Sequence, residues 1–151
     1  MEKIGNKLAV WSLMGLLCLL AWGCDKKWPI NGNLDGNWKL QRFETKEDAK
    51  VTECHRLYVA IQLHMVEFKD QGGNGFDSFF GEFRYDEDKE TAVIYNLKGK
   101  EFTTDSNIPV EVEQLKHYGL NSQHNVFKVV KADGKYLILE SDYAKLYMKK
   151  F

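Results

Sequence analysis

The sequence predicts an all-β domain, an antiparallel up-and-down β-barrel of about eight strands with one short helix. Three observations lead to this prediction. Apolar and polar residues alternate with period two in several segments after residue 34, turn signals separate these segments, and one segment has a helical pattern. A sandwich would share these signals. A barrel of this size is just wide enough to be filled by its own side chains or to hold one small ligand.

The first residues predict an exported protein. After a lysine-containing start, residues 8–20 form an apolar run that is too short for a comfortable membrane-spanning helix. Ala21 and Gly23 then precede Cys24, and a small residue directly before a cysteine, behind such a run, resembles the lipobox of bacterial lipoproteins. The resemblance implies cleavage before Cys24, with lipid attached to its thiol and to its new α-amine.

Two other interpretations of the N-terminus are an ordinary secretory signal with an incidental cysteine and an uncleaved anchor. We favour the lipoprotein. It divides the chain into a signal peptide (residues 1–23), a lipidated tether (24–33) and one domain (34–151). Several acyl chains would hold such a protein on a bilayer almost permanently, so the expected partner at Cys24 is a membrane.

Composition excludes two classes of protein. The formal net charge is −1, without a basic stripe along the chain, which argues against a nucleic-acid partner. Of three cysteines, Cys18 would leave with the signal and Cys24 would be acylated, so Cys54 would be the one free thiol. An intramolecular disulfide is then impossible, and stability must come from an apolar core.

The domain opens with residues 34–43, LDGNWKLQRF. Trp38 and Leu40 alternate with polar neighbours, which predicts a strand with one apolar face. Gly36 permits a backbone turn that a side chain would block. A Gly-x-Trp at the start of a first strand is similar to the opening motif of lipocalins, in which the tryptophan closes one end of a β-barrel.

The next two segments predict a loop and a bent strand. Residues 44–55 are charged and lack periodicity, as in a loop. Residues 57–63 then alternate strictly, but the apolar parity changes at Val66 and Phe68. A parity change inside one β segment requires a bulge or a sharp bend, which we place near residues 63–65.

The middle of the domain predicts two further strands and the one helix. A glycine-rich loop precedes strands over residues 79–85 and 91–96, and residues 99–107 form a loop or an irregular strand. Residues 109–118 then suit a helix, because Pro109 fits the first helical position and Gly119 the position just past the end. We expect this helix, with Val112, Leu115 and Gly119 on one side, to lie against or across a barrel mouth.

Residues 126–141 predict a β-hairpin. Two registers are open, one with a two-residue Asp133-Gly134 turn and one with a three-residue turn that adds Ala132. We choose the second, because pairing Val129 with Leu137 gives a clean apolar face. A last strand, with Leu146 and Met148 facing inward, follows a turn at residues 142–143.

The whole domain resembles the small lipocalin-like lipoproteins of gut Gram-negative bacteria of the Bacteroidetes type. The resemblance rests on the pattern and order of four segments, LDGNWKLQ, VAIQLHMVEFKD, LKHYGL and LILESDYAKLYMKKF. It implies a lipocalin-like barrel whose final strand closes beside the first. Together with the lipobox, it leads us to expect a lipid-anchored protein of the cell envelope, on the outer membrane, facing the periplasm or the surface. Most of the family has no assigned ligand, so the resemblance implies more about the fold than about the function.

No motif for catalysis or metal binding stands out. Cys54 and His55 are adjacent, but adjacent side chains on an extended chain point apart, so they do not form a nucleophile–base pair. The four histidines lack the spacing of a metal site. The acidic residues 86–90 lack the glycine and the spacing of an EF-hand, and residues 72–75 lack the lysine and helix of a phosphate-binding loop. We therefore expect no enzyme activity, metal or cofactor.

Six aromatic residues form the candidate ligand site on the predicted inward faces. They are Trp38, Phe68, Phe83, Tyr85, Tyr95 and Phe127. They fit a pocket for a small apolar or amphipathic ligand, or equally a packed core without a cavity. The second case predicts an envelope structural or protein-interaction module, with residues 44–55 and 97–108 as its contact surfaces. A cavity of roughly 300 Å³ or more would favour the binding protein.

Overall fold

The structure is a computed structural model that describes residues 29–100 and 105–151. The predicted signal peptide and the predicted lipidation site, Cys24, lie outside these residues. In chain order the elements are η2 (Gly32–Leu34), β1 (Gly36–Thr45), β2 (Val51–Gln62), β3 (Met65–Asp70), β4 (Phe79–Asp86), β5 (Thr91–Lys100), β6 (Asp105–Pro109), α2 (Val112–Lys116), β7 (His124–Ala132), β8 (Tyr136–Glu140) and β9 (Ala144–Lys150).

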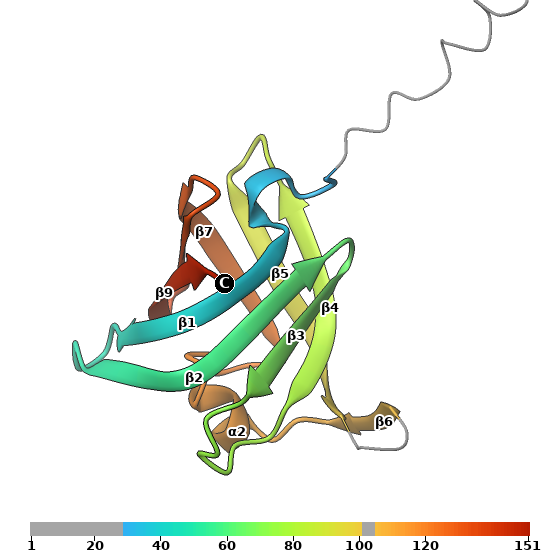
Figure 1. Ribbon diagram of the computed structural model, residues 1–151, viewed down its shortest axis with the longest axis vertical. Coiled ribbons are helices and arrows are strands. Elements are labelled where there is room, and N and C mark those ends of the chain that lie inside the picture. Colours follow the sequence, from blue (N-terminus) through green and yellow to red (C-terminus); the bar gives the residue numbers. More distant parts are fainter. Residues whose placement is uncertain (1–28, 101–104) are drawn as a thin grey trace, which may run out of the picture.

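The strands form one antiparallel sheet that closes into a barrel (Figure 1). Their order is β4-β3-β2-β1-β9-β8-β7-β5-β6, and an additional β4–β5 pairing closes eight strands, with β6 as an extra strand on β5. The first and last strands pair along their length, from Trp38 opposite Lys150 to Thr45 opposite Ala144. The predicted eight-stranded barrel, with its final strand beside the first, is confirmed.

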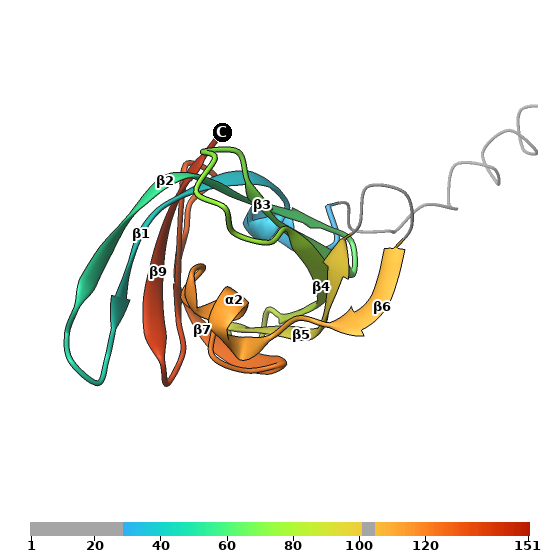
Figure 2. The ribbon, with the colours of Figure 1, turned by 90° about the horizontal axis from the view of Figure 1, so that it is seen from below.

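The connections alternate between two ends of the barrel. The α2 end carries α2, the loop of residues 71–78, and the turns at residues 46–50 and 141–143 (Figure 2). The η2 end carries η2 and the turns at residues 63–64, 87–90 and 133–135 (Figure 1). This alternation decides which loops meet, because every second connection lies at the same end.

Trp38 is the centre of the core at the η2 end. Its ring is fully buried, and its Nε1 donates a hydrogen bond to the Leu34 carbonyl oxygen at 2.9 Å. The Lys150 ammonium lies 4.4 Å from the centroid of the Trp38 ring and donates to the Asp35 carbonyl oxygen at 2.7 Å. Gly36 has φ +136°, and a Cβ there would collide with the Lys150 side chain. The Gly-x-Trp motif therefore builds a compact seal of this end.

Aromatic side chains fill the barrel toward the other end. The rings of Phe68 and Phe79 stack with 4.9 Å between their centroids, and Tyr118 packs edge-on against both, at 5.5 and 5.1 Å. Leu115 and Leu120, from α2 and the residues after it, are fully buried beside this cluster. The α2 segment thus fills the barrel mouth from below, as the helix across a mouth was expected to do (Figure 2).

The β2–β3 connection corrects the predicted bulge near residues 63–65. Gln62 lies opposite Met65, so Leu63 and His64 form a two-residue hairpin turn. Leu63 has φ +57°, the left-handed conformation that a tight hairpin turn requires. Reversal of the chain, rather than an extra residue, therefore changes the apolar parity. Neither residue is a glycine, asparagine or aspartate, so this turn carries none of the usual turn signals.

The predicted loop over residues 44–55 is largely strand. β1 extends to Thr45 and β2 begins at Val51. The Asp48 carboxylate accepts hydrogen bonds from the Thr45 hydroxyl and the Lys50 amide, which fixes the turn between them. This hairpin reaches beyond the filled part of the barrel, so residues 51–56 are exposed or half-buried and show no strict apolar alternation.

The second predicted contact loop, residues 97–108, is also mostly strand. β5 continues to Lys100, and β6 pairs back on it with Lys98 opposite Pro109. β6 projects from the barrel beside β4 and β5 (Figure 2). Of the two alternatives for residues 99–107, the irregular strand is the one seen, because the β5–β6 pairing has a register shift between Lys98 and Lys100.

The helix is shorter than the predicted 109–118 segment. α2 contains five residues, and Pro109 ends β6 instead of beginning the helix. Leu115 is buried, but Val112 is 40% exposed, so the two do not share a buried face. Gly119 follows the helix with φ +77°, as its position past the helix end requires.

The β7–β8 hairpin has neither of the two registers considered. Val129 pairs with Leu139 rather than Leu137, and Ala132 pairs with Leu137. A register shift at Val130 absorbs the extra residue, and the turn falls one position later, where the Asp133 carboxylate accepts hydrogen bonds from two following amides. The inward parity survives because a bulge and a shifted turn compensate each other.

Candidate functional site

A groove of about 430 Å³ opens at the α2 end of the barrel. It lies between the β1–β2 hairpin on one side and α2 with residues 71–78 on the other, and Figure 2 shows these segments facing each other across that end. The lining residues are Phe43, Thr45, Asp48, Lys50, Thr52, Glu53, Cys54, His55, Leu57, Asn74, Phe76, Glu113, Lys116, His117 and Tyr143.

The inner part of the groove is apolar and aromatic. Phe43 and Leu57 reach it from the barrel core, where they are 4% and 1% exposed. Phe76 and His117 stack almost parallel, with 3.9 Å between the ring centroids and an interplanar angle of 6°. A flat apolar group could lie against this surface with little loss of side-chain freedom, since both rings are already held.

The outer part of the groove is polar and charged. The Lys116 ammonium pairs with the Glu113 carboxylate at 2.7 Å along α2. On the opposite side, hydrogen bonds from the Thr45 hydroxyl and the Lys50 amide lower the pKa of Asp48, so this carboxylate is ionised at neutral pH. The groove therefore combines an apolar inner surface with a rim of both charges, which suits an amphipathic molecule.

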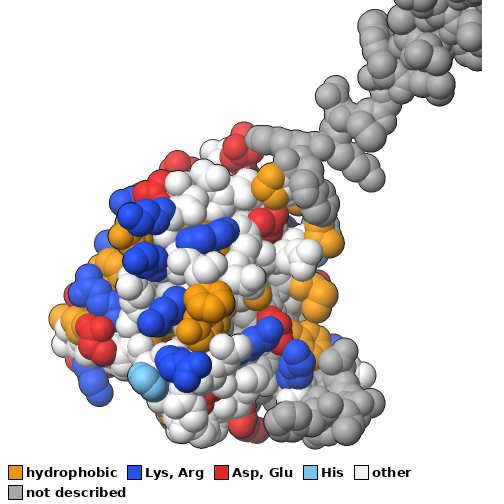
Figure 3. All heavy atoms as spheres, in the orientation of Figure 1, with side chains coloured by type: hydrophobic (Ala, Val, Ile, Leu, Met, Phe, Trp, Pro, Cys, Tyr) orange, Lys and Arg blue, Asp and Glu red, His pale blue; other side chains and the backbone are white. Residues whose placement is uncertain are grey.

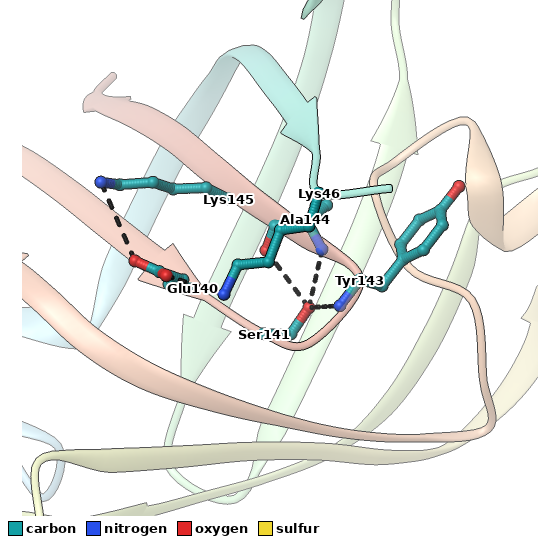
Figure 4. A network of polar contacts seen from close by, with 6 residues as sticks. All are labelled: Lys46, Glu140, Ser141, Tyr143, Ala144 and Lys145. Carbon is teal, nitrogen blue, oxygen red and sulfur yellow. Dashed lines mark hydrogen bonds and ion pairs between the residues drawn. The ribbon is translucent and has the colours of Figure 1, made fainter. Parts of the chain in front are cut away.

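Tyr143 is positioned by the β8–β9 turn (Figure 4). The Ser141 hydroxyl oxygen accepts hydrogen bonds from the amides of Tyr143 and Ala144, at 3.2 and 3.1 Å. The Tyr143 carbonyl in turn accepts from the Lys46 amide at 2.9 Å, which ties this turn to the β1–β2 hairpin. The two turns therefore form one rigid side of the groove.

Asp70 organises the loop that carries Phe76. Its carboxylate accepts hydrogen bonds from the Gly72 amide and the Asn74 side-chain amide, both at 2.8 Å, and from the Phe76 amide at 3.2 Å. Burial alone would raise the pKa of Asp70, but these hydrogen bonds together lower it. The ionised Asp70 carboxylate therefore fixes the conformation of residues 71–76 through these hydrogen bonds.

The loop and α2 are joined to each other. The Asp77 amide donates to the Gln114 side-chain oxygen at 3.1 Å, and the buried Tyr118 hydroxyl donates to the Asp77 carbonyl at 3.0 Å. Burial raises the pKa of Tyr118, with the nearby Asp70 and Asp77 charges adding to the effect, so the hydroxyl stays protonated as a donor. These bonds hold Phe76 against His117.

Cys54 is the free thiol within the described residues, and it is protonated at neutral pH. Burial, with a smaller contribution from the Glu53 charge, raises the pKa of the Cys54 thiol to about 12. A nucleophile or metal ligand requires the thiolate, which is negligible at neutral pH with such a pKa. The groove therefore offers a neutral, weakly polar sulfur surface rather than a reactive group.

Two other features bear on the chemistry of the described residues. In residues 29–100 and 105–151, no group of three or more His, Cys, Asp or Glu side chains is arranged to hold a metal ion. In the same ranges, no helix has the length and apolarity needed to cross a membrane.

A wider hollow of about 600 Å³ lies on the other side of residues 71–78. Charged groups dominate it, and the Glu67 carboxylate pairs there with the ammonium groups of Lys69 and Lys100. Because these charges already satisfy one another, a ligand would have to replace strong existing contacts. The groove of about 430 Å³ is the better candidate site for that reason.

The family of lipocalin-like domains matches residues 17–151. The chain belongs to the lipocalin-like domain family. Two solved structures share the fold of this lipocalin-like protein. A lipocalin-like protein from Bacteroides uniformis ATCC 8492 aligns with a TM-score of 0.57 and 20% identity over 80% of this chain and 100% of its own. An uncharacterized protein from Bacteroides eggerthii DSM 20697 aligns with a TM-score of 0.57 and 16% identity over 78% of this chain and 98% of its own. Comparison with curated proteins finds no match.

Four of the six predicted ligand residues of this lipocalin-like protein are packed in its core. Trp38, Phe68, Phe83 and Phe127 are at most 1% exposed, and Tyr85 is half-buried against the same core. None of them lines the groove. The interior aromatic set therefore fills the barrel, and the groove of about 430 Å³ lies beside it.

Tyr95 corrects the prediction of an inward face. Its neighbours Ile94 and Leu97 are buried, whereas the Tyr95 ring lies beside the exposed Arg84 and His124 on the outer wall. Asn96, with φ +53°, adds an extra residue between the inward positions Ile94 and Leu97. Tyr95 therefore faces outward, and not inward as predicted.

The groove residues Phe76, His117 and Tyr143 were missed as a set in the sequence. They lie in three connections at the α2 end, and each connection contains few apolar residues. The signal that could have found them is the alternation of connections between the barrel ends, which brings every second loop together.

Replacing Asp70 by asparagine is expected to lower the free energy of unfolding by about 1–2 kcal/mol at neutral pH, because the Phe76 amide loses a charged acceptor. The lowered pKa means that this stabilisation is present above about pH 4 and is lost as the pH falls through the folded-state value. Urea denaturation at neutral and acid pH checks this. The curves of D70N and the wild type should converge in acid, and the exposed D142N should match the wild type throughout.

Proposed function

We propose that the protein is a lipid-anchored envelope protein that binds a small amphipathic molecule in the groove at the α2 end. The observation that carries the proposal is the combination of an apolar inner surface, a charged rim and a volume of about 430 Å³. That volume lies within the range of roughly 300–1,000 Å³ that small-molecule sites occupy. The lipocalin-like fold is compatible with this function.

The groove favours a ligand with a flat apolar body and a polar head. The stacked Phe76 and His117 rings provide an aromatic surface, and the Phe43 side chain continues it toward the core. At the rim, Lys50 suits an anionic or hydrogen-bonding head group. Binding rather than catalysis is supported by the neutral state of the Cys54 thiol beside them.

The ligand is tested first by extraction. The folded protein is purified from its native host, extracted with organic solvent, and the extract is compared by mass spectrometry with that of an unrelated protein prepared alongside. A stoichiometric small molecule is the expected result and would give the ligand class. An empty extract, with no thermal shift from fatty acids, sterols or haem-like compounds, would contradict the proposal.

Groove variants place the ligand. F76A and H117A are expected to weaken binding of the extracted compound about tenfold each, because each removes one ring of the stacked pair. The matched control is F80A, which removes a phenylalanine from the outer wall of β4. Isothermal titration measures all three. Equal affinity of F76A and F80A for the compound would show that the ligand does not bind in the groove.

The packed interior also favours a second candidate, a protein-interaction module of the envelope. The largest side chains of the barrel are fully buried against one another, which gives a rigid body suited to presenting hairpins. The residues named as contact surfaces form the tip of the β1–β2 hairpin and the β5–β6 edge. If no ligand is recovered, cross-linking and pull-down with the intact chain would be expected to give one reproducible partner through the 46–50 turn.

The anchor is proposed from the sequence, on the lipobox resemblance at Ala21-Trp22-Gly23-Cys24. The expected site is the outer membrane of a Gram-negative envelope. Cys24→Ala is expected to release the protein from membranes, because no acyl chain can then be attached at this position. Fractionation of the native host measures the shift, and Cys54→Ala is the control. A Cys24 variant that stays fully bound to membranes would contradict the anchor.

A further inference from the structure

Basic side chains gather on the outer wall formed by β1, β9 and the β7–β8 hairpin. We call this the basic wall, and it consists of Lys39, Arg42, Lys131, Lys135 and Lys149. Figure 3 shows lysine and arginine side chains concentrated over β1 and β9. The wall stands out because the chain as a whole carries a net charge of −1.

One row of the basic wall places like charges side by side. Lys39 on β1 lies directly opposite Lys149 on β9, and the row continues to Tyr58 on β2 and Tyr136 on β8. Like charges in directly opposed positions destabilise a sheet. Neither ammonium forms an ion pair with another residue in the described part of the chain.

A second row on the same face of the sheet, separated from the first by the row of Arg42 and Tyr147, shows how charges here can be balanced. There Glu140 pairs with Lys46 at 2.8 Å and with Lys145 at 3.8 Å (Figure 4). The row with Lys39 and Lys149 lacks such a carboxylate. The fold itself gives no reason for this difference, so an external anion is the natural partner of the unbalanced row.

Tyrosines are interleaved with these cations. The Arg42 guanidinium lies 4.2 Å from the centroid of the Tyr147 ring, and the ammonium groups of Lys131 and Lys135 lie 5.2 and 5.3 Å from that of Tyr136. Aromatic rings with polar tips, next to long basic side chains, are typical of protein surfaces at the head-group level of a bilayer.

Before it enters β1 of this wall, the described chain crosses the η2 end of the barrel, where the Asn31 side chain donates to the Leu63 carbonyl oxygen at 2.7 Å. Near its start, the Asn33 side chain donates to the Ala132 carbonyl on β7, and Lys150 of β9 donates to the Asp35 carbonyl. Pro29 lies five residues after Cys24, and five extended residues span at most about 18 Å. A lipid on Cys24 would therefore keep the η2 end, and the wall next to it, near the bilayer.

We propose that the basic wall docks on an anionic lipid surface and lays the barrel on its side against the membrane. This inference rests on the proposed anchor at Cys24. Basic residues close to a membrane are attracted to anionic head groups, and an anchor removes most of the entropic cost of that contact. The acidic β4–β5 turn, with Asp86, Glu87, Asp88 and Glu90, would be repelled by the same surface and would favour this orientation.

Lysine labelling tests the docking with the full lipidated chain. The protein is reconstituted into vesicles of phosphatidylcholine alone or with phosphatidylglycerol, and the rate of acylation of each lysine is followed by mass spectrometry. On the anionic vesicles, Lys39, Lys135 and Lys149 are expected to react at about one third of their rate on neutral vesicles, or more slowly still. High salt should restore their rates. Lys89, in the acidic turn and 78% exposed, should react equally on both. Equal rates for all four lysines would overturn the docking.

Two further arms separate the anchor from the wall. The double variant K39Q/K149Q should lose the protection of Lys135, whereas K89Q/K98Q should keep it. A chain that fails to float with neutral vesicles contradicts the anchor. In that case, flotation with anionic vesicles would still support docking of the basic wall, and failure to float with them would overturn it. Protection of the same lysines by a soluble sulfated polysaccharide, without protection by anionic vesicles, would also overturn the lipid surface as partner.

Discussion

Replacing Trp38 by alanine is expected to lower the free energy of unfolding by about 4 kcal/mol, a large part of the stability of a domain of this size. The ring is fully buried at the η2 end, and its removal leaves a cavity that the surrounding strands cannot fill. It also leaves the Leu34 carbonyl without the indole donor and the Lys150 ammonium without the ring beneath it. Urea denaturation followed by circular dichroism measures the loss.

The control for this change is Trp38→Phe. Phenylalanine keeps most of the apolar volume but cannot donate to Leu34, so a loss of about 1–2 kcal/mol is expected. Together the two variants separate the packing of the ring from its hydrogen bond. A loss below about 1 kcal/mol for W38A would show that Trp38 does not hold the end of the barrel closed.

Replacing Gly119 by alanine is expected to lower the free energy of unfolding by about 3 kcal/mol. Gly119 has φ +77°, a conformation that disfavours a side chain. Its new Cβ would also collide with the Leu146 side chain and come within 3.0 Å of Phe43 Cγ. Because Tyr118 and Leu120 on either side are buried in the mouth, relief of the clash requires the whole segment to move outward.

Gly73→Ala is the matched control for this prediction. Gly73 has a similar φ of +70°, but a Cβ there would meet no atom within 4 Å. Its loss of stability should reflect the backbone alone, about 1 kcal/mol. The difference between the two variants in urea denaturation then measures the packing around Gly119. Equal losses would show that the mouth segment is loosely held. A displaced segment should also weaken ligand binding, because Phe43 belongs to the groove.

The fold was predictable because period-two alternation survives in the filled part of the barrel. Leu57, Val59 and Ile61 face inward without interruption, and the same is true of Leu146 and Met148 in the last strand. Where hairpins extend past the core, both faces meet solvent, and the alternation disappears. For this reason residues 51–56 have the composition of a loop, although they form part of a strand.

The site was harder to predict than the fold because it depends on one turn. With a bulge at residues 63–65, the glycine-rich loop after β3 would lie at the opposite end from the 46–50 turn. The actual Leu63-His64 turn adds one strand, and this brings Phe76 to the same end as the β1–β2 hairpin. A single unrecognised turn thus exchanges the ends at which all later loops meet, while it changes almost none of the inward residues.

The pairing of the first strand with the last has a consequence for how the chain is made. β1 has only one of its two neighbours until β9 has been synthesised, because Trp38 pairs with Lys150 across nearly the whole domain. Contacts so distant in sequence form slowly. A chain that stops before Ala144 would leave the edges of β1 and β8 open, and open edges are templates for aggregation. A chain truncated before β9 is therefore expected to aggregate more readily than the full-length chain.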